Sequence, residues 1–264
     1  MSLITDKFSN IEAQIQITGK WNNKTAYVFH ILGRRKGFTS TSVWNDVKEF
    51  DNAVADVPFL AGSEALEVVS DNVNDTAAGT GARTVKIVYI NNSGALTESA
   101  AITLNGTTAV ATGFTANGIL WMENVTVGSN MVSVGNIILR NATDHTTQYE
   151  QITANGNKSM SGRFLVPTGF TAYLNTNWHM SAIGGADQDT RIRATVNSFD
   201  RSLNAGNVFH FQDIMYIPNS MAMEMGVPWI KFPAGCRIKV STLSSATGNT
   251  NRIDANYTVV LIAN

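Results

Sequence analysis

Cysteine, charge and long apolar runs are all scarce in this sequence of 264 residues. The single cysteine, Cys236, excludes an internal disulfide framework and a cysteine-based zinc cluster. Charged residues make up 15% of the chain, against a typical value of about 25%, and 19 basic residues nearly balance 20 acidic ones. We therefore expect no broad basic face for nucleic acid or for an anionic membrane surface. No apolar run approaches the roughly 20 residues of a membrane helix, and the first ten residues lack the apolar stretch of a signal peptide.

Neutral polar residues take the place of charge. The chain contains 28 Thr, 27 Asn and 21 Gly, but only 5 Pro. Threonine suits strands because its β-branched side chain fits a pleated surface, and Asn and Gly supply the backbone conformations of tight turns. This composition predicts an all-β protein, an antiparallel jelly-roll-like sandwich or sandwiches. At most one short helix is expected, from Val43 to about Val54, where apolar residues fall near helical spacing.

Short apolar or alternating segments separated by turn signals recur along the whole chain, at the spacing typical of a sandwich or barrel. The expected strands are 11–17, 26–32, 65–70, 83–90, 97–104, 107–112, 119–127, 131–140, 148–153, 160–166, 170–178, 190–199, 208–217, 236–243 and 255–262. The last of these is nearly all apolar, which favours a central strand over an edge strand.

Three regions are expected from this pattern. Residues 1–42 are interpreted as N-terminal docking strands, 43–141 as a small β domain and 142–264 as a jelly-roll-like sandwich, with one continuous sandwich as the alternative. A basic turn, Arg34-Arg35-Lys36 between two glycines, is the candidate docking element, and a plain surface hairpin is its alternative.

One loop carries a resemblance to known proteins. The stretch Asp75-Thr76-Ala77-Ala78-Gly79-Thr80-Gly81-Ala82-Arg83-Thr84-Val85 follows the strand 64–70 and precedes Leu104-Asn105-Gly106-Thr107. In this order the segments resemble structural proteins of tailed bacteriophages, over about residues 43–141 and less specifically at the end of the chain. The resemblance implies a virion component assembled in the host cytoplasm, in contact with other virion proteins and with copies of itself. A trimer is the oligomer expected in such a particle.

The same loop makes physical sense without the resemblance. Small residues at 76–82 allow close backbone packing, or positive φ angles at Gly79 and Gly81. Arg83 is placed to reach backbone carbonyls or a carboxylate such as Asp75. We expect a structural clamp. The glycine spacing is not a phosphate loop, because no Gly-Lys-Ser/Thr and no helix follow it.

Catalytic and metal-binding patterns are weak. The histidines (His30, His145, His179 and His210) do not occur in metal-ligand spacing, and Asp187-Gln188-Asp189 favours a turn over a calcium loop. No GxSxG elbow is present, and Cys236 is interpreted as a small buried apolar residue. A pair of distant carboxylates suited to glycoside hydrolysis remains a minor alternative that sequence alone does not test. We expect no cofactor and no bound metal.

Aromatic and methionine residues offer two surface hypotheses. Trp178 and Trp229 are candidates for stacking on sugar rings, although such residues more often cover a core or an interface. Met221, Met223 and Met225 form an adaptable apolar segment that favours a subunit contact over a lid on the core. The sequence therefore predicts a non-enzymatic virion structural protein that acts through assembly contacts. A glycan-binding receptor protein of the virion is the alternative.

Overall fold

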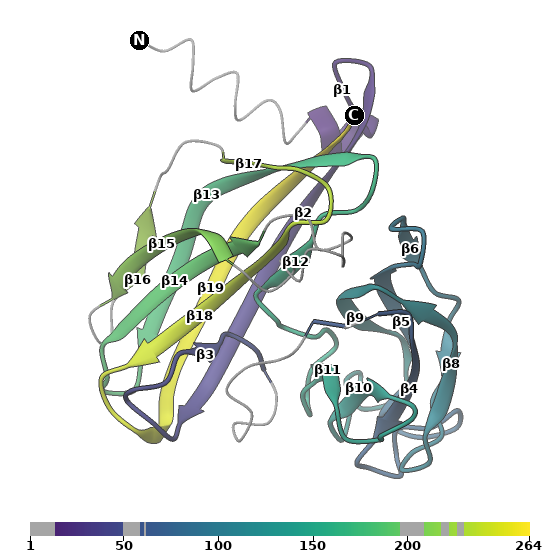
Figure 1. Cartoon of the computed structure of the whole chain (residues 1–264). Helices are drawn as coiled ribbons and strands as arrows, with labels where there is room; N and C mark the ends of the chain where they lie inside the picture. The colour runs from purple at the N-terminus through teal and green to yellow at the C-terminus, as the bar shows by residue number, and fades with distance from the viewer. Residues whose placement is uncertain (1–13, 50–58, 61, 196–208, 218–221, 226–229) are drawn as a thin grey trace.

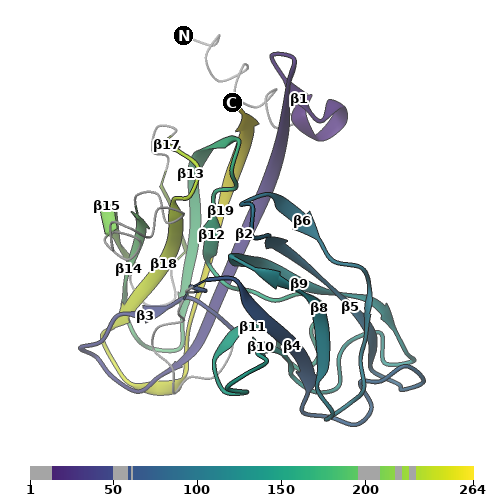
Figure 2. The same ribbon diagram turned by 45° about the vertical axis from the view of Figure 1, so that its right-hand side comes forward.

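The computed structural model describes residues 14–49, 59–60, 62–195, 209–217, 222–225 and 230–264, and these are almost entirely antiparallel β-strands. The all-β prediction is confirmed. Two β units lie side by side, a long sandwich and a smaller unit built from the middle of the chain (Figure 1). Figure 2 shows that the two are joined beside β2 and diverge away from it.

The larger unit has the strand order of a jelly roll. One sheet has the order β1-β2-β19-β13-β16, with β17 also paired to β13, and the other has β12-β18-β14-β15, with β3 also paired to β18. Its strands are β1 (Lys20–Trp21), β2 (Lys24–Phe38), β3 (Asn45–Asp46), β12 (Arg163–Leu165), β13 (Phe170–Ile183), β14 (Gln188–Thr195), β15 (Phe209–Ile217), β16 (Ala222–Met225), β17 (Ile230–Phe232), β18 (Arg237–Ser244) and β19 (Gly248–Ala263).

The smaller unit is inserted between two strands of this sandwich, after β3 and before β12. Its first sheet has the order β11-β10-β4-β8, and in the second β5 pairs with β6, β7 and β9. The strands are β4 (Glu64–Ser70), β5 (Ala82–Ile90), β6 (Leu96–Glu98), β7 (Ile102–Thr103), β8 (Val110–Ala116), β9 (Gly118–Val127), β10 (Ile137–Asn141) and β11 (Gln148–Ile152).

The sheet boundaries do not coincide with the expected divisions at residues 42 and 142. β2 pairs with β19 from Ala26 to Lys36 and at Phe38, so a strand from the first region completes the sandwich. β11 pairs with β10, which keeps 148–152 in the inserted unit. Sequence distance hid the first pairing, because β2 and β19 are separated by roughly 200 residues of chain and no local turn connects them.

The core of the sandwich extends into the inserted unit, which also has a core cluster of its own. Alternate residues of β19 (Ile253, Ala255, Tyr257, Val259 and Leu261) are buried between the two sheets of the sandwich, and β19 is a central strand as expected. The same apolar cluster includes Val88, Ile90 and Leu120 of the inserted unit. At the junction the ring of Phe29 contacts those of Trp121 and Phe164, with centroids 5.5 and 5.7 Å away.

Two local predictions are wrong. Residues 14–18 are helical, although the alternating segment 11–17 predicts a strand. One face of this turn buries Ile15 against Ala26 and Val260, and the other leaves Ile17 83% exposed. The segment 43–49 is not helical, because Asn45–Asp46 pairs with Ser241 and Thr242 of β18. The rest of the expected helix, 50–54, lies outside the described residues.

The basic segment is also different from expectation. Arg34, Arg35 and Lys36 continue β2 and form no turn. Gly33 is required there for close packing, since a Cβ would lie 2.8 Å from the nitrogen of Gly162 and from the carbonyl oxygen of Val47. The segments around Val47 and Gly162 therefore pack against β2 at the point where the sequence predicts a turn.

Candidate functional site

Asp75 is the centre of the loop that carries the sequence resemblance. Its side chain is fully buried. Oδ1 accepts hydrogen bonds from the backbone nitrogens of Ala82 (2.8 Å) and Val134 (2.9 Å). Oδ2 accepts from Ser70 Oγ (2.7 Å) and from the nitrogen of Gly135 (2.8 Å). One carboxylate thus joins three chain segments, and charge-assisted bonds of this kind are among the strongest in proteins.

The glycines of the loop permit close approach between backbones. A Cβ on Gly79 would lie 1.9 Å from the carbonyl oxygen of Asn74, and one on Gly81 would lie 2.1 Å from Asp75 Oδ1. Neither glycine has a positive φ, so close packing is the reason for both. Arg83 Nε donates to the carbonyl oxygen of Gly79 at 3.1 Å and so ties the loop to the start of β5. The contacts are those of a structural clamp.

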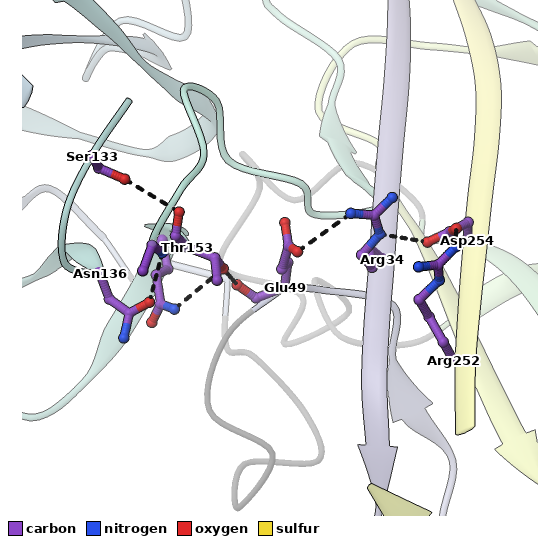
Figure 3. Close-up of polar contacts among 9 residues, drawn as sticks. Arg34, Glu49, Ser133, Asn136, Thr153, Arg252 and Asp254 are labelled. Atoms are coloured by element: carbon purple, nitrogen blue, oxygen red, sulfur yellow. Dashed lines mark hydrogen bonds and ion pairs between the residues drawn. The ribbon is translucent and has the colours of Figure 1, made fainter. Parts of the chain in front are cut away.

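The clamp is connected to the sandwich through a chain of polar contacts (Figure 3). Ser133, beside the two nitrogens that bind Asp75, donates to the carbonyl oxygen of Thr153 at 3.3 Å. Thr153 Oγ1 donates to the backbone carbonyl of Glu49 at 2.8 Å. The Glu49 side chain extends to Arg34 of β2, with Oε1 3.6 Å from Nη1.

Charge is concentrated at the sandwich end of this path. Arg34 Nε donates to Asp254 Oδ1 at 2.7 Å, and Arg252 Nη2 lies 2.9 Å from Asp254 Oδ2. The hydrogen bond to Asp254 raises the pKa of Arg34, while burial raises the pKa of Glu49, with Arg34 offsetting only part of that effect. A pocket of about 310 Å³ lies beside Arg34 and Asp254, and Met160 is among its lining residues.

Two buried ion pairs join strands, one within the sandwich and one between the sandwich and the inserted unit. Lys239 Nζ lies 3.0 Å from Asp46 Oδ1 and connects β18 to β3. Arg163 Nη2 lies 2.9 Å from Glu150 Oε1 and connects β12 to β11 of the inserted unit. Each of these side chains is at most 4% exposed. Removal of one member would take a charged partner away from a buried charge, so these pairs help to specify how the strands meet.

The described candidate interface residues lie in two strands: the basic segment in β2, and Met223 and Met225 in β16. Arg35 is fully buried, with Nη1 3.4 Å from the backbone carbonyl of Asp46, and Arg34 is paired as described. Lys36 is the exposed member of the basic segment. Met223 and Met225 belong to the outer strand β16, where they pair with Met180 and Trp178 of β13. Met221 lies outside the described residues.

The other candidates are not brought together. Trp178 lies in β13, and Trp229 is outside the described residues. His30 Nδ1 is 3.1 Å from Thr258 Oγ1, and His145 Nδ1 is 2.8 Å from Glu67 Oε1. His179 and His210 lie in the different strands β13 and β15. Asp187 accepts a 2.8 Å hydrogen bond from the hydroxyl of Tyr216, and within the described ranges no cluster of three His, Cys, Asp or Glu residues suits a metal ion.

Cys236 is buried as expected. Burial raises the pKa of its thiol to about 11, which keeps it protonated and unreactive at neutral pH. No helix in the described part of the chain is long and apolar enough to cross a membrane.

The network that connects Thr153, Glu49 and Arg34 at the junction was not predicted from sequence. Its members come from distant segments, so the run of polar residues near Glu49 is its one local signal.

No protein-family model and no curated protein matches the chain. Among solved structures, it is similar to the VP2 subviral particle of infectious bursal disease virus, with a TM-score of 0.26 and 11% identity over 91% of this chain and 72% of that chain. The infectious bursal disease virus Gt strain gives a TM-score of 0.18 and 10% identity, covering 92% of this chain and 73% of that one. Likenesses of this size carry no argument about function.

Proposed function

We propose that the chain is a non-enzymatic structural subunit of a tailed-bacteriophage virion, acting through protein–protein contacts in a capsid, neck or tail assembly. The observation that carries the proposal is the clamp around Asp75. The segments that resemble phage structural proteins, residues 75–85 and 102–110, meet in a rigid structural device. Both oxygens of the Asp75 carboxylate accept hydrogen bonds from within the protein, as expected for a residue with a structural role.

The architecture supports the same role. A jelly roll with an inserted β unit offers large, stable faces, and the shared apolar cluster with the buried Arg163–Glu150 pair fixes the two units to each other. Fixed geometry matters to a subunit that repeats in a symmetric assembly, because small errors in angle add up over many copies.

Purified particles test the proposal. Particles banded on a density gradient from an infected culture are digested and quantified by mass spectrometry. The chain should be present at a fixed ratio to the other virion proteins, in many copies per particle. Its presence in the lysate but not in washed particles would overturn the proposal.

Ligand and activity assays separate the alternatives. Binding on a glycan array that is lost in Trp178→Ala or Trp229→Ala would support the receptor-binding function instead. Turnover of a host surface polysaccharide by the purified chain would support an enzyme. The proposal predicts neither result.

A further inference from the structure

The side of the sandwich that faces away from the inserted unit ends in two outer strands, β15 and β16 (Figure 1). Among the described strands, β15 pairs only with β14. It has nine residues, which makes it a long edge, and its sequence FHFQDIMYI contains no Lys, Arg or Pro. Edge strands that remain unpaired usually carry such residues or are short, because a bare edge pairs with other strands.

Two other outer strands of the described chain carry features that discourage pairing. β2 carries Arg34, Arg35 and Lys36, and its Arg34 pairs with Glu49. β8 has seven residues, an irregular register and Gly113 at φ +77°. β15 has no Lys or Arg, and its register with β14 shifts only near its first residues, at Ala194 and Thr195.

The direction of each backbone group in β15 follows from the register. In β18 the nitrogen and oxygen of Val240 bond to Gly162 and Val47, away from β14. Backbone groups alternate along a strand, so Ser241 faces β14, where it is paired with Arg191. The next residue of β14, Ile192, then faces β15.

Ile192 is paired with Asp213, so Asp213 uses its backbone groups within the sheet. The alternation turns the backbone N–H and C=O of Gln212 and Ile214 outward, to the edge with which no other described strand pairs. These two residues present two donors and two acceptors in the spacing of an antiparallel partner strand.

We infer that this edge pairs with β15 of a second copy of the chain, antiparallel and across a two-fold axis. An antiparallel edge is complementary to itself, because a two-fold rotation places each donor opposite an acceptor. The contact extends the sheet β12-β18-β14-β15 from one copy into the next. The inference rests on the proposed function, which places many copies in one particle. It identifies the surface through which these copies associate.

Hydrogen exchange on the isolated full chain tests the contact without any substitution. At high protein concentration the amides of Gln212 and Ile214 should be protected, and on dilution they should exchange at least tenfold faster. The amide of Asp213 faces β14 and should remain protected at both concentrations. Equal exchange of Gln212 and Ile214 at all concentrations would overturn the inference.

A substitution provides the second test. Gln212→Pro removes one outward donor but no bond to β14, and proline is tolerated on a free edge. Light scattering should show the mass of the native oligomer halved in Gln212→Pro and unchanged in Gln212→Ala, with equal circular dichroism. An oligomer that survives Gln212→Pro, or a wild-type chain that is monomeric, contradicts the edge pairing. Neither result bears on whether the chain is found in particles, so failure of the two proposals is distinguishable.

Discussion

The carboxylate of Asp75 binds the backbone nitrogen of Ala82 at 2.8 Å, and this contact closes the loop whose sequence resembles phage structural proteins. The same Oδ1 atom also accepts from Val134, in a segment more than fifty residues away. The conspicuous motif is therefore one half of a contact whose other half, the backbone of 134–135, has no sequence signature.

Substitution of Asp75 should be costly. Asp75→Asn keeps the shape but replaces one acceptor oxygen with an NH₂ group, which then faces donors. We expect a loss of about 2–4 kcal/mol in the free energy of unfolding, because buried donors lose a charged acceptor. Urea denaturation measures it. Asp71→Asn is the matched control, since Asp71 binds Asn136 at an exposed position and should change stability by less than about 1 kcal/mol. Equal effects would show that Asp75 is not a clamp.

Two glycines distinguish close packing from backbone strain. Gly79→Ala places a Cβ 1.9 Å from the carbonyl oxygen of Asn74, whereas Gly113→Ala meets no atom within 4 Å but has a φ of +77°. The second change should cost about 1–2 kcal/mol, the price of a left-handed alanine. Gly79→Ala should cost more, because backbone must move. Thermal unfolding of both variants ranks them, and a smaller effect for Gly79→Ala would contradict the packing explanation.

Strands and their turns were largely predictable because they depend on local alternation and on Asn and Gly. The expected strands 83–90 and 97–104 illustrate this, since β5 and β6 fall in them and pair as a hairpin. Segment 43–49 shows the limit. Its apolar spacing favours a helix, but Asp46 is drawn into the sandwich by Lys239, nearly 200 residues later. Tertiary pairing overrides local propensity there.

The candidate site was predictable to a smaller extent. Asp75, Gly79, Gly81 and Arg83 were recognisable as a group because they are contiguous in sequence. The junction residues Glu49 and Thr153 were not, because their contact uses a backbone carbonyl, which every residue possesses. The basic segment was misleading for a related reason. Arginine is usually exposed, and only the folded structure shows Arg35 as a buried residue of β2.

The buried pair Lys239–Asp46 should show strong coupling. Lys239→Met removes a buried cation 3.0 Å from the Asp46 carboxylate and should cost about 3–5 kcal/mol. Asp46→Asn should cost a similar amount, but the double variant should lose less than the sum by at least about 1 kcal/mol. A double-mutant cycle in urea measures this coupling. Additive losses would show that the two charges are stabilised by other groups.

Glu49 provides a pH dependence with a definite sign. Burial raises its pKa in the folded protein above the ordinary value of 4.5, so the folded state holds the proton more tightly than the unfolded state. Stability from this group is therefore present below pH 4.5 and is lost as the pH rises through the raised pKa. Arg34 lowers the pKa of Glu49 from one side, Arg252 does so weakly, and Asp254 raises it. Arg34→Gln should consequently shift the Glu49 titration to still higher pH and enlarge the loss of stability.

Carbon-detected NMR of the glutamate carboxyls follows this titration directly, and urea unfolding between pH 4 and 8 follows its effect on stability. Glu49→Gln is the control: it keeps the backbone carbonyl that binds Thr153 and should remove the pH dependence that Glu49 contributes. The wild-type protein, compared with Glu49→Gln, should lose stability as the pH rises above 4.5. A midpoint for Glu49 at or below 4.5, or an Arg34→Gln variant that titrates at lower pH than wild type, would contradict the assignment of burial as the dominant influence at the junction.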